Sequence, residues 1–63
     1  MVMNQALSLP GLEAVYDTLA RAIDQAGDGK AELFLVKLAL LNAQALGDDA
    51  VFQQHVQMAL QDL

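Results

Sequence analysis

The chain has 63 residues, a net charge of −5 at pH 7 and an apolar fraction of 56%, of which little is aromatic. A domain of this size lies near the limit at which burial of apolar surface offsets the conformational entropy lost on folding. The absence of cysteine and the single histidine exclude disulfides and thiolate metal sites and argue against an all-protein zinc site. The acidic balance disfavours nucleic acid and anionic membrane surfaces as partners. Association with another chain is the remaining way to add core.

A core rich in Leu, Ala and Val predicts an all-α protein. We expect an N-terminal arm at 1–9 and a single three-helix domain at 10–63, made of a helical hairpin followed by a C-terminal helix. The longest apolar run is interrupted by Lys37, Asn42 and Gln44, so no membrane-spanning helix is expected. No secretory signal pattern is visible at the start, and we therefore expect a cytoplasmic protein.

The first helix is expected at 10–26. Ser8 or Leu9 is suited to cap it, and Pro10 is suited to its first turn. Its apolar positions recur at helical spacing and its charged positions take the other side, which is typical of an amphipathic helix. The apolar face is formed by Leu12, Val15, Tyr16, Leu19, Ile23 and Ala26.

The sequence Gly27-Asp28-Gly29 predicts a short connection of about two to four residues. Gly27 can end the first helix with a positive φ angle, and Asp28 can cap the next N-terminus. A connection this short makes the first and second helices antiparallel neighbours.

The second helix, expected at 30–46, is apolar nearly all round, with Lys37 and Gln44 as its obvious wet stripe. Such a helix must be covered from several sides, and two short helices are all that the chain supplies. Its apolar residues fall into two sectors, which are Phe34, Leu38, Leu41 and Ala45, and Leu33, Val36, Leu40 and Ala43. We expect one sector to receive the first and third helices. The remainder is most economically covered by a second copy across a two-fold axis. The predicted dimer interface is Leu35, Val36, Ala39, Leu40, Asn42, Ala43 and Leu46.

Asn42 is the polar residue within this predicted interface. Its simpler interpretation is a partly exposed or locally bonded side chain. The alternative is a buried amide that pairs across a symmetric interface and fixes its register.

The third helix is expected at 49–62. Gly47 can end the second helix, and Asp48 or Asp49 can cap the third, where negative charge meets the positive end of the helix dipole. Its apolar face is formed by Val51, Phe52, Val56, Ala59, Leu60 and Leu63.

The sequence contains no complete catalytic, metal-binding or nucleotide-binding motif, and we expect no cofactor. His55 lies at the edge of the apolar face of the third helix, which favours a packing role over catalysis because no nucleophile or orienting acid accompanies it. Tyr16 fits a packing residue with a wet hydroxyl, and Asp48 fits a helix cap. His55, Tyr16 and Asp48 are therefore the candidate residues for a functional site.

The stretch at 12–59 resembles a family of short bacterial proteins, domain-of-unknown-function family 2783. The residues that carry the resemblance are Tyr16, Leu19, the run Leu38-Ala39-Leu40-Leu41, Ala43 and the corner Leu46-Gly47-Asp48. Where that family has an Asn-His-like pair shortly before the Gly-Asp, this chain has Gln44-Ala45, so no polar site transfers. The resemblance implies a small helical dimer. Some members of the family look as if they are encoded beside flavin-dependent aromatic hydroxylases, which implies an accessory role in catabolism.

We therefore expect a small, acidic, non-enzymatic interaction or accessory protein, forming an intertwined or side-by-side homodimeric helical bundle. Two alternatives stay open. One is a small-ligand-binding or minimal catalytic site at the subunit junction that uses His55 and Tyr16. The other is an unidentified protein that docks on the acidic outer face of the first helix, at Glu13, Asp17 and Asp24.

Overall fold

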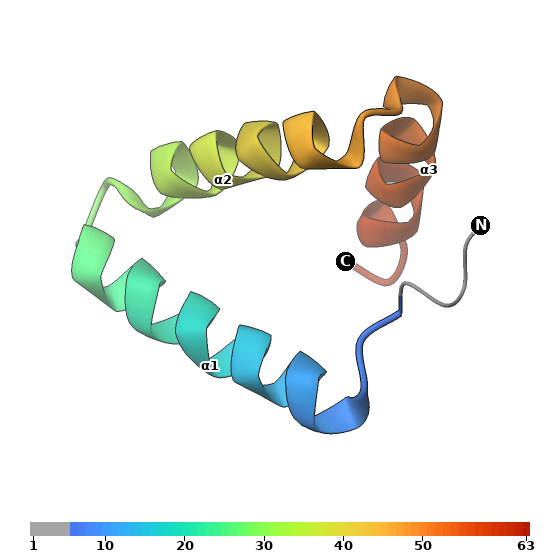
Figure 1. Ribbon diagram of the computed structural model, residues 1–63. Coiled ribbons are helices and arrows are strands. Elements are labelled where there is room, and N and C mark those ends of the chain that lie inside the picture. The colour runs from blue at the N-terminus through green and yellow to red at the C-terminus, as the bar shows by residue number, and fades with distance from the viewer. Residues whose placement is uncertain (1–5) are drawn as a thin grey trace.

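The computed structural model describes residues 6–63, which form an all-α chain of three helices. They are α1 (Leu9–Ala26), α2 (Ala31–Leu46) and α3 (Asp49–Leu60). Helices α1 and α2 diverge from the corner that joins them. At the far end of α2 the chain turns, and α3 runs back toward the side on which α1 lies, so that the three helices outline an open triangle (Figure 1). Contacts link α1 to α2 and α2 to α3, whereas α1 and α3 make none within the described residues.

The N-terminus of α1 is capped as the sequence predicts. Ser8 is extended, and its Oγ accepts a hydrogen bond of 3.1 Å from the backbone N–H of Gly11. This bond satisfies one of the free donors at the start of a helix. Pro10 lies in the first turn, where its missing N–H costs nothing. The helix begins at Leu9, one residue earlier than expected.

The connection from α1 to α2 is short, but the prediction that Asp28 caps α2 is wrong. Gly27 and Gly29 both adopt positive φ angles, of 86° and 81°, and they place a turn between Asp28 and the helix. Lys30 is therefore the N-cap residue, and its side chain makes no capping bond. The turn is closed by the backbone N–H of Lys30, which donates to the carbonyl of Gly27 at 3.1 Å.

The corner between α2 and α3 follows the predicted pattern. Gly47 is left-handed, with φ 71° and ψ 19°, and its N–H donates to the carbonyl of Ala43 at 2.9 Å. Asp48 is the cap: its Oδ1 accepts from the N–H of Val51 at 3.1 Å. Asp49 lies in the first turn of α3, which ends at Leu60 rather than at 62 as predicted.

The three helices meet along two separate apolar seams, and no described side chain is fully buried. On α2, Phe34 and Leu38 are half-buried toward α1, and Ala43 is half-buried beside Phe52 of α3. Leu41, which belongs to the same predicted sector as Phe34 and Leu38, is 69% exposed. The half-buried residues of the α1–α2 seam are Leu19, Ala22, Ile23, Ala26, Ala31, Phe34 and Leu38, and those near α3 are Ala39, Ala43, Val51 and Phe52.

The open arrangement leaves an unusually large surface. The chain exposes 5708 Å², whereas a compact monomer of 6.8 kDa is expected to expose roughly 4,000 Å². None of the helices in the described part of the chain is long and apolar enough to cross a bilayer.

Candidate functional site

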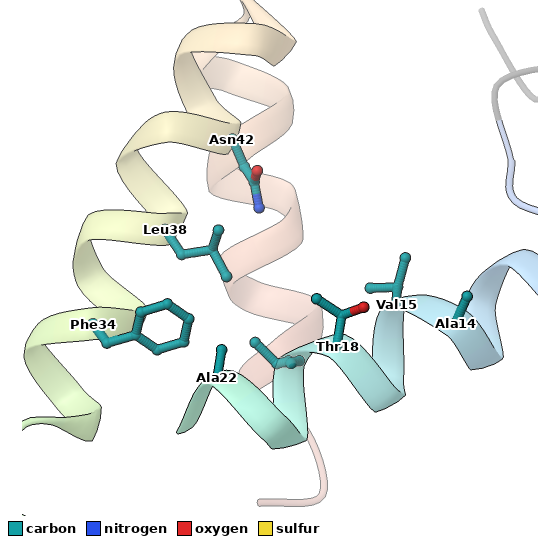
Figure 2. Close-up of a pocket in the computed structure, with 8 residues that line it drawn as sticks. Ala14, Val15, Thr18, Ala22, Phe34, Leu38 and Asn42 are labelled. Carbon is teal, nitrogen blue, oxygen red and sulfur yellow. The ribbon is translucent and has the colours of Figure 1, made fainter. Parts of the chain in front are cut away.

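A groove lies between α1 and α2, on the inner side of their open angle (Figure 2). Its volume is about 500 Å³. Thr18 and Asn42 are its polar side chains, and none of its lining residues is ionisable. The residues that line it are Ala14, Val15, Thr18, Leu19, Ala22, Phe34, Leu38 and Asn42, which we call the groove face.

Helix α1 contributes mostly small side chains to the groove face. Ala14, Thr18 and Ala22 recur every four residues and therefore lie above one another on one side of the helix. Short side chains allow another helix backbone to approach closely. The larger Leu12 and Tyr16 do not line the groove, and line instead a shallow depression elsewhere on α1 together with Glu13 and Asp17.

Helix α2 contributes Phe34, Leu38 and Asn42 at the same four-residue spacing, and all three project toward α1 (Figure 2). The Asn42 amide lies at the open end of this row and is exposed. In the described part of the chain the side-chain hydrogen bonds are the two helix caps, and Asn42 takes part in neither.

The predicted interface on α2 lies where apolar side chains are uncovered. Leu35 and Leu46 are 39% and 41% exposed, and Val36 and Leu40 are 50% and 63% exposed. Asn42 is exposed as well, while Ala39 and Ala43 are half-buried. The groove shows that α1 adds to this uncovered surface through Ala14, Val15, Thr18 and Ala22. Sequence reasoning missed that contribution, although the spacing of small residues at 14, 18 and 22 was a signal for it.

The three candidate residues for chemistry are not brought together within one subunit. His55 is exposed on α3 and Tyr16 is 71% exposed on α1, and those two helices do not contact each other in the described residues. Asp48 lies at the corner between α2 and α3, where its carboxylate already caps α3. That corner holds a hollow of about 400 Å³ that includes Asp48, Asp49 and Phe52. No histidine or nucleophile accompanies the two carboxylates there.

The described residues contain no group of three or more His, Cys, Asp or Glu side chains that could hold a metal ion. What the geometry offers is an apolar, charge-free concave surface with one amide and one hydroxyl. Such a surface suits contact with another helix better than it suits acid–base chemistry.

Structure and groove together define a class: an all-α, three-helix protein with an open apolar groove. Comparison with known proteins finds no family model, no curated protein and no solved structure that matches this chain. The likeness to family 2783 therefore stays a prediction that rests on the residues quoted for it.

Proposed function

We propose that this chain is a small, non-enzymatic accessory protein that works as a homodimer, and that its uncovered apolar surface is where two copies associate. One observation carries the proposal: the apolar central helix stays partly uncovered, and no described side chain is fully buried. Exposed apolar surface in one continuous region is typical of an interaction site. A second copy that covers the apolar surface between α1 and α2 would provide the buried core that a single copy lacks.

The distribution of charge supports a second copy of the chain as the partner that covers the groove face. Each chain carries a net charge of −5, so two copies repel each other, and the repulsion is smallest when they meet through a surface free of charge. The groove face is free of charge. The acidic residues Glu13, Asp17 and Asp24 lie outside it, where they remain in solvent in a dimer.

The available area also supports the proposal. A specific interface takes roughly 800 Å² from each partner. The surface that this chain exposes beyond that of a compact monomer exceeds this requirement. The uncovered surface is therefore large enough to hold an interface of that size.

A pair of variants tests the proposal. Leu35→Glu places a charge beside the groove face, and we expect it to raise the Kd for self-association by at least about a hundredfold, because an unpaired charge would be buried. Leu63 is 98% exposed, so Leu63→Glu is the matched control and should change the Kd by less than about twofold. Sedimentation velocity measures both. Equal Kd values for the two variants would refute the proposed surface.

A binding or catalytic site at the subunit junction is the second candidate. The observation in its favour is that His55 and Tyr16 are both exposed and lie on helices that do not meet within a subunit. Only a second copy could therefore bring them together. The proton resonances of His55 in the dimer test this: a Tyr16→Phe variant should shift them if the two side chains meet and leave them unchanged otherwise.

Docking of an unrelated protein on the acidic outer face of α1 is a separate proposal. A variant with Glu13, Asp17 and Asp24 reversed to Lys distinguishes it, since the reversal should abolish capture of such a protein and leave the homodimer intact. The cytoplasmic location and the exclusion of nucleic acid and membrane partners stay predictions from composition.

A further inference from the structure

Asn42 is placed where a polar side chain is costly once the groove is covered. It lies four residues after Leu38 on the side of α2 that faces the groove, and its amide has no hydrogen-bond partner among the described residues (Figure 2). In the open subunit, water satisfies this amide. When another surface covers the groove, the amide needs a new partner, because a buried amide without hydrogen bonds is strongly unfavourable.

The groove of a single subunit offers the Asn42 amide few hydrogen-bond partners. Its polar companion in the groove is Thr18, whose hydroxyl can bond to a carbonyl one turn earlier in its own helix. The other lining side chains are apolar. The partner must therefore come from whatever covers the groove.

We propose that Asn42 lies beside the two-fold axis of the homodimer and pairs with Asn42 of the second copy; this rests on the proposed function. A carboxamide is self-complementary, because its NH₂ group donates and its oxygen accepts. Across a two-fold axis the same residue meets itself. One N–H of each amide then donates to the oxygen of the other, so that each copy has one donor and its acceptor oxygen paired.

The pattern of α2 around Asn42 fits an antiparallel helix pair. Leu35, Leu38, Asn42 and Ala45 follow alternating steps of three and four residues, the spacing of a helix-packing seam. With the axis at Asn42, Leu38 of one copy lies level with Leu46 of the other. Leu46 is 41% exposed in the single subunit, and this register would cover it.

The amide also selects one register over its neighbours. A seam of Leu and Ala alone can slide by one turn at little cost, since apolar contacts are not directional. Sliding here would bury Asn42 against Leu38 or Leu46 without a partner. A single polar residue in an apolar seam is known to fix register in this way.

The absence of cysteine makes a direct test available. Asn42→Cys should form a disulfide between the two copies in a glutathione redox buffer, because a two-fold axis beside residue 42 brings the Cα atoms within the roughly 7 Å that a disulfide requires. Gln44 lies about 200° further round the helix, so Gln44→Cys is the control. We expect at least about tenfold more cross-linked dimer for Asn42→Cys, measured by non-reducing electrophoresis at equal concentration.

A second pair of variants covers the case in which the cysteine variants fold poorly. Asn42→Asp and Gln44→Glu each add one negative charge, but only the first places two like charges at the axis. We expect Asn42→Asp to raise the Kd of the dimer at pH 7 by at least about tenfold and Gln44→Glu by less than about threefold.

The outcomes separate this inference from the proposed function. A wild-type dimer whose residue 42 neither cross-links nor responds to charge more than residue 44 overturns the Asn42 pair and leaves the homodimer standing. A wild-type chain that is monomeric and folded overturns both.

Discussion

Single side chains decide where the helices of this chain begin and end, because each helix has few packing contacts to fix its ends. Asp48 is the clearest case. α3 has 12 residues, a length at which an isolated helix is marginal in water. Its cap therefore contributes a larger share of its stability than a cap does in a well-buried helix.

Replacement of the Asp48 cap is expected to weaken the fold. Asp48→Ala removes the acceptor for the N–H of Val51 and should lower the free energy of unfolding by about 1 kcal/mol. Asp48→Asn keeps an acceptor and should recover most of this loss. Urea unfolding followed by circular dichroism measures both. Equal losses for the two variants would show that charge, rather than capping, is what Asp48 provides.

Gly47 is expected to be sensitive for a different reason. Its φ angle is +71°, and a Cβ atom added there would meet nothing within 4 Å. Gly47→Ala should therefore cost only backbone strain, about 1 to 2 kcal/mol, and Gly47→Asn should cost less because Asn tolerates this conformation better. Thermal unfolding checks the order. A destabilisation by Asn as large as that by Ala would contradict a backbone origin.

Helix α2 determines the shape of the chain, because both neighbours contact it and do not contact each other in the described residues. Phe34 and Leu38 are half-buried toward α1 (Figure 2), and Ala43 is half-buried beside Phe52 of α3. A helix covered in this incomplete way leaves both the groove face and the exposed Leu35 and Leu46 available to a second copy.

Local patterns in the sequence predicted the three helices and most of their ends. Ser8, Gly27, Gly47 and Asp48 act within one turn of their own position, so their roles can be inferred from neighbouring residues alone. The prediction that Asp28 caps α2 was wrong, because Gly29 adopts a positive φ angle and shifts the start of α2.

The groove was not predictable in the same way. Which side of α2 receives each neighbour depends on the geometry of both corners, and no periodicity in one helix contains that information. The four-residue spacing of Ala14, Thr18 and Ala22 indicates a side of α1 with small side chains, but the groove that this side forms with α2 follows only from the placement of the two helices.

The small side chains of α1 are expected to matter for association. Ala14 lines the groove, so Ala14→Leu should obstruct the approach of a second copy and raise the Kd by about tenfold, a cost typical of overpacking. Ala20 is exposed and lies outside the groove, and Ala20→Leu is the matched control. Sedimentation velocity gives both constants. A weaker dimer for Ala20→Leu alone would place the interface on the other side of α1.

The molecule as a whole is acidic and apolar at once, and these two properties act in opposite directions on association. The net charge of −5 on each copy opposes approach, whereas exposed Leu and Val side chains favour it. Since added salt screens the repulsion and leaves the apolar contact intact, the dimer should tighten by a few-fold between about 50 and 500 mM NaCl. Isothermal dilution calorimetry measures this change. A dimer that weakens with salt would instead indicate an interface held by ion pairs.

Stability and association should also be coupled. If folding is completed by dimer formation, the midpoint of thermal unfolding depends on protein concentration through mass action. We expect the midpoint to rise by several degrees for a hundredfold increase in concentration. A constant midpoint at all concentrations would mean that the chain folds alone.

The most direct test of self-association is the mass of the wild-type chain in solution, measured by sedimentation equilibrium at micromolar concentration. We predict twice the chain mass of 6.8 kDa. A well-folded helical species at the mass of a single chain would contradict the homodimer.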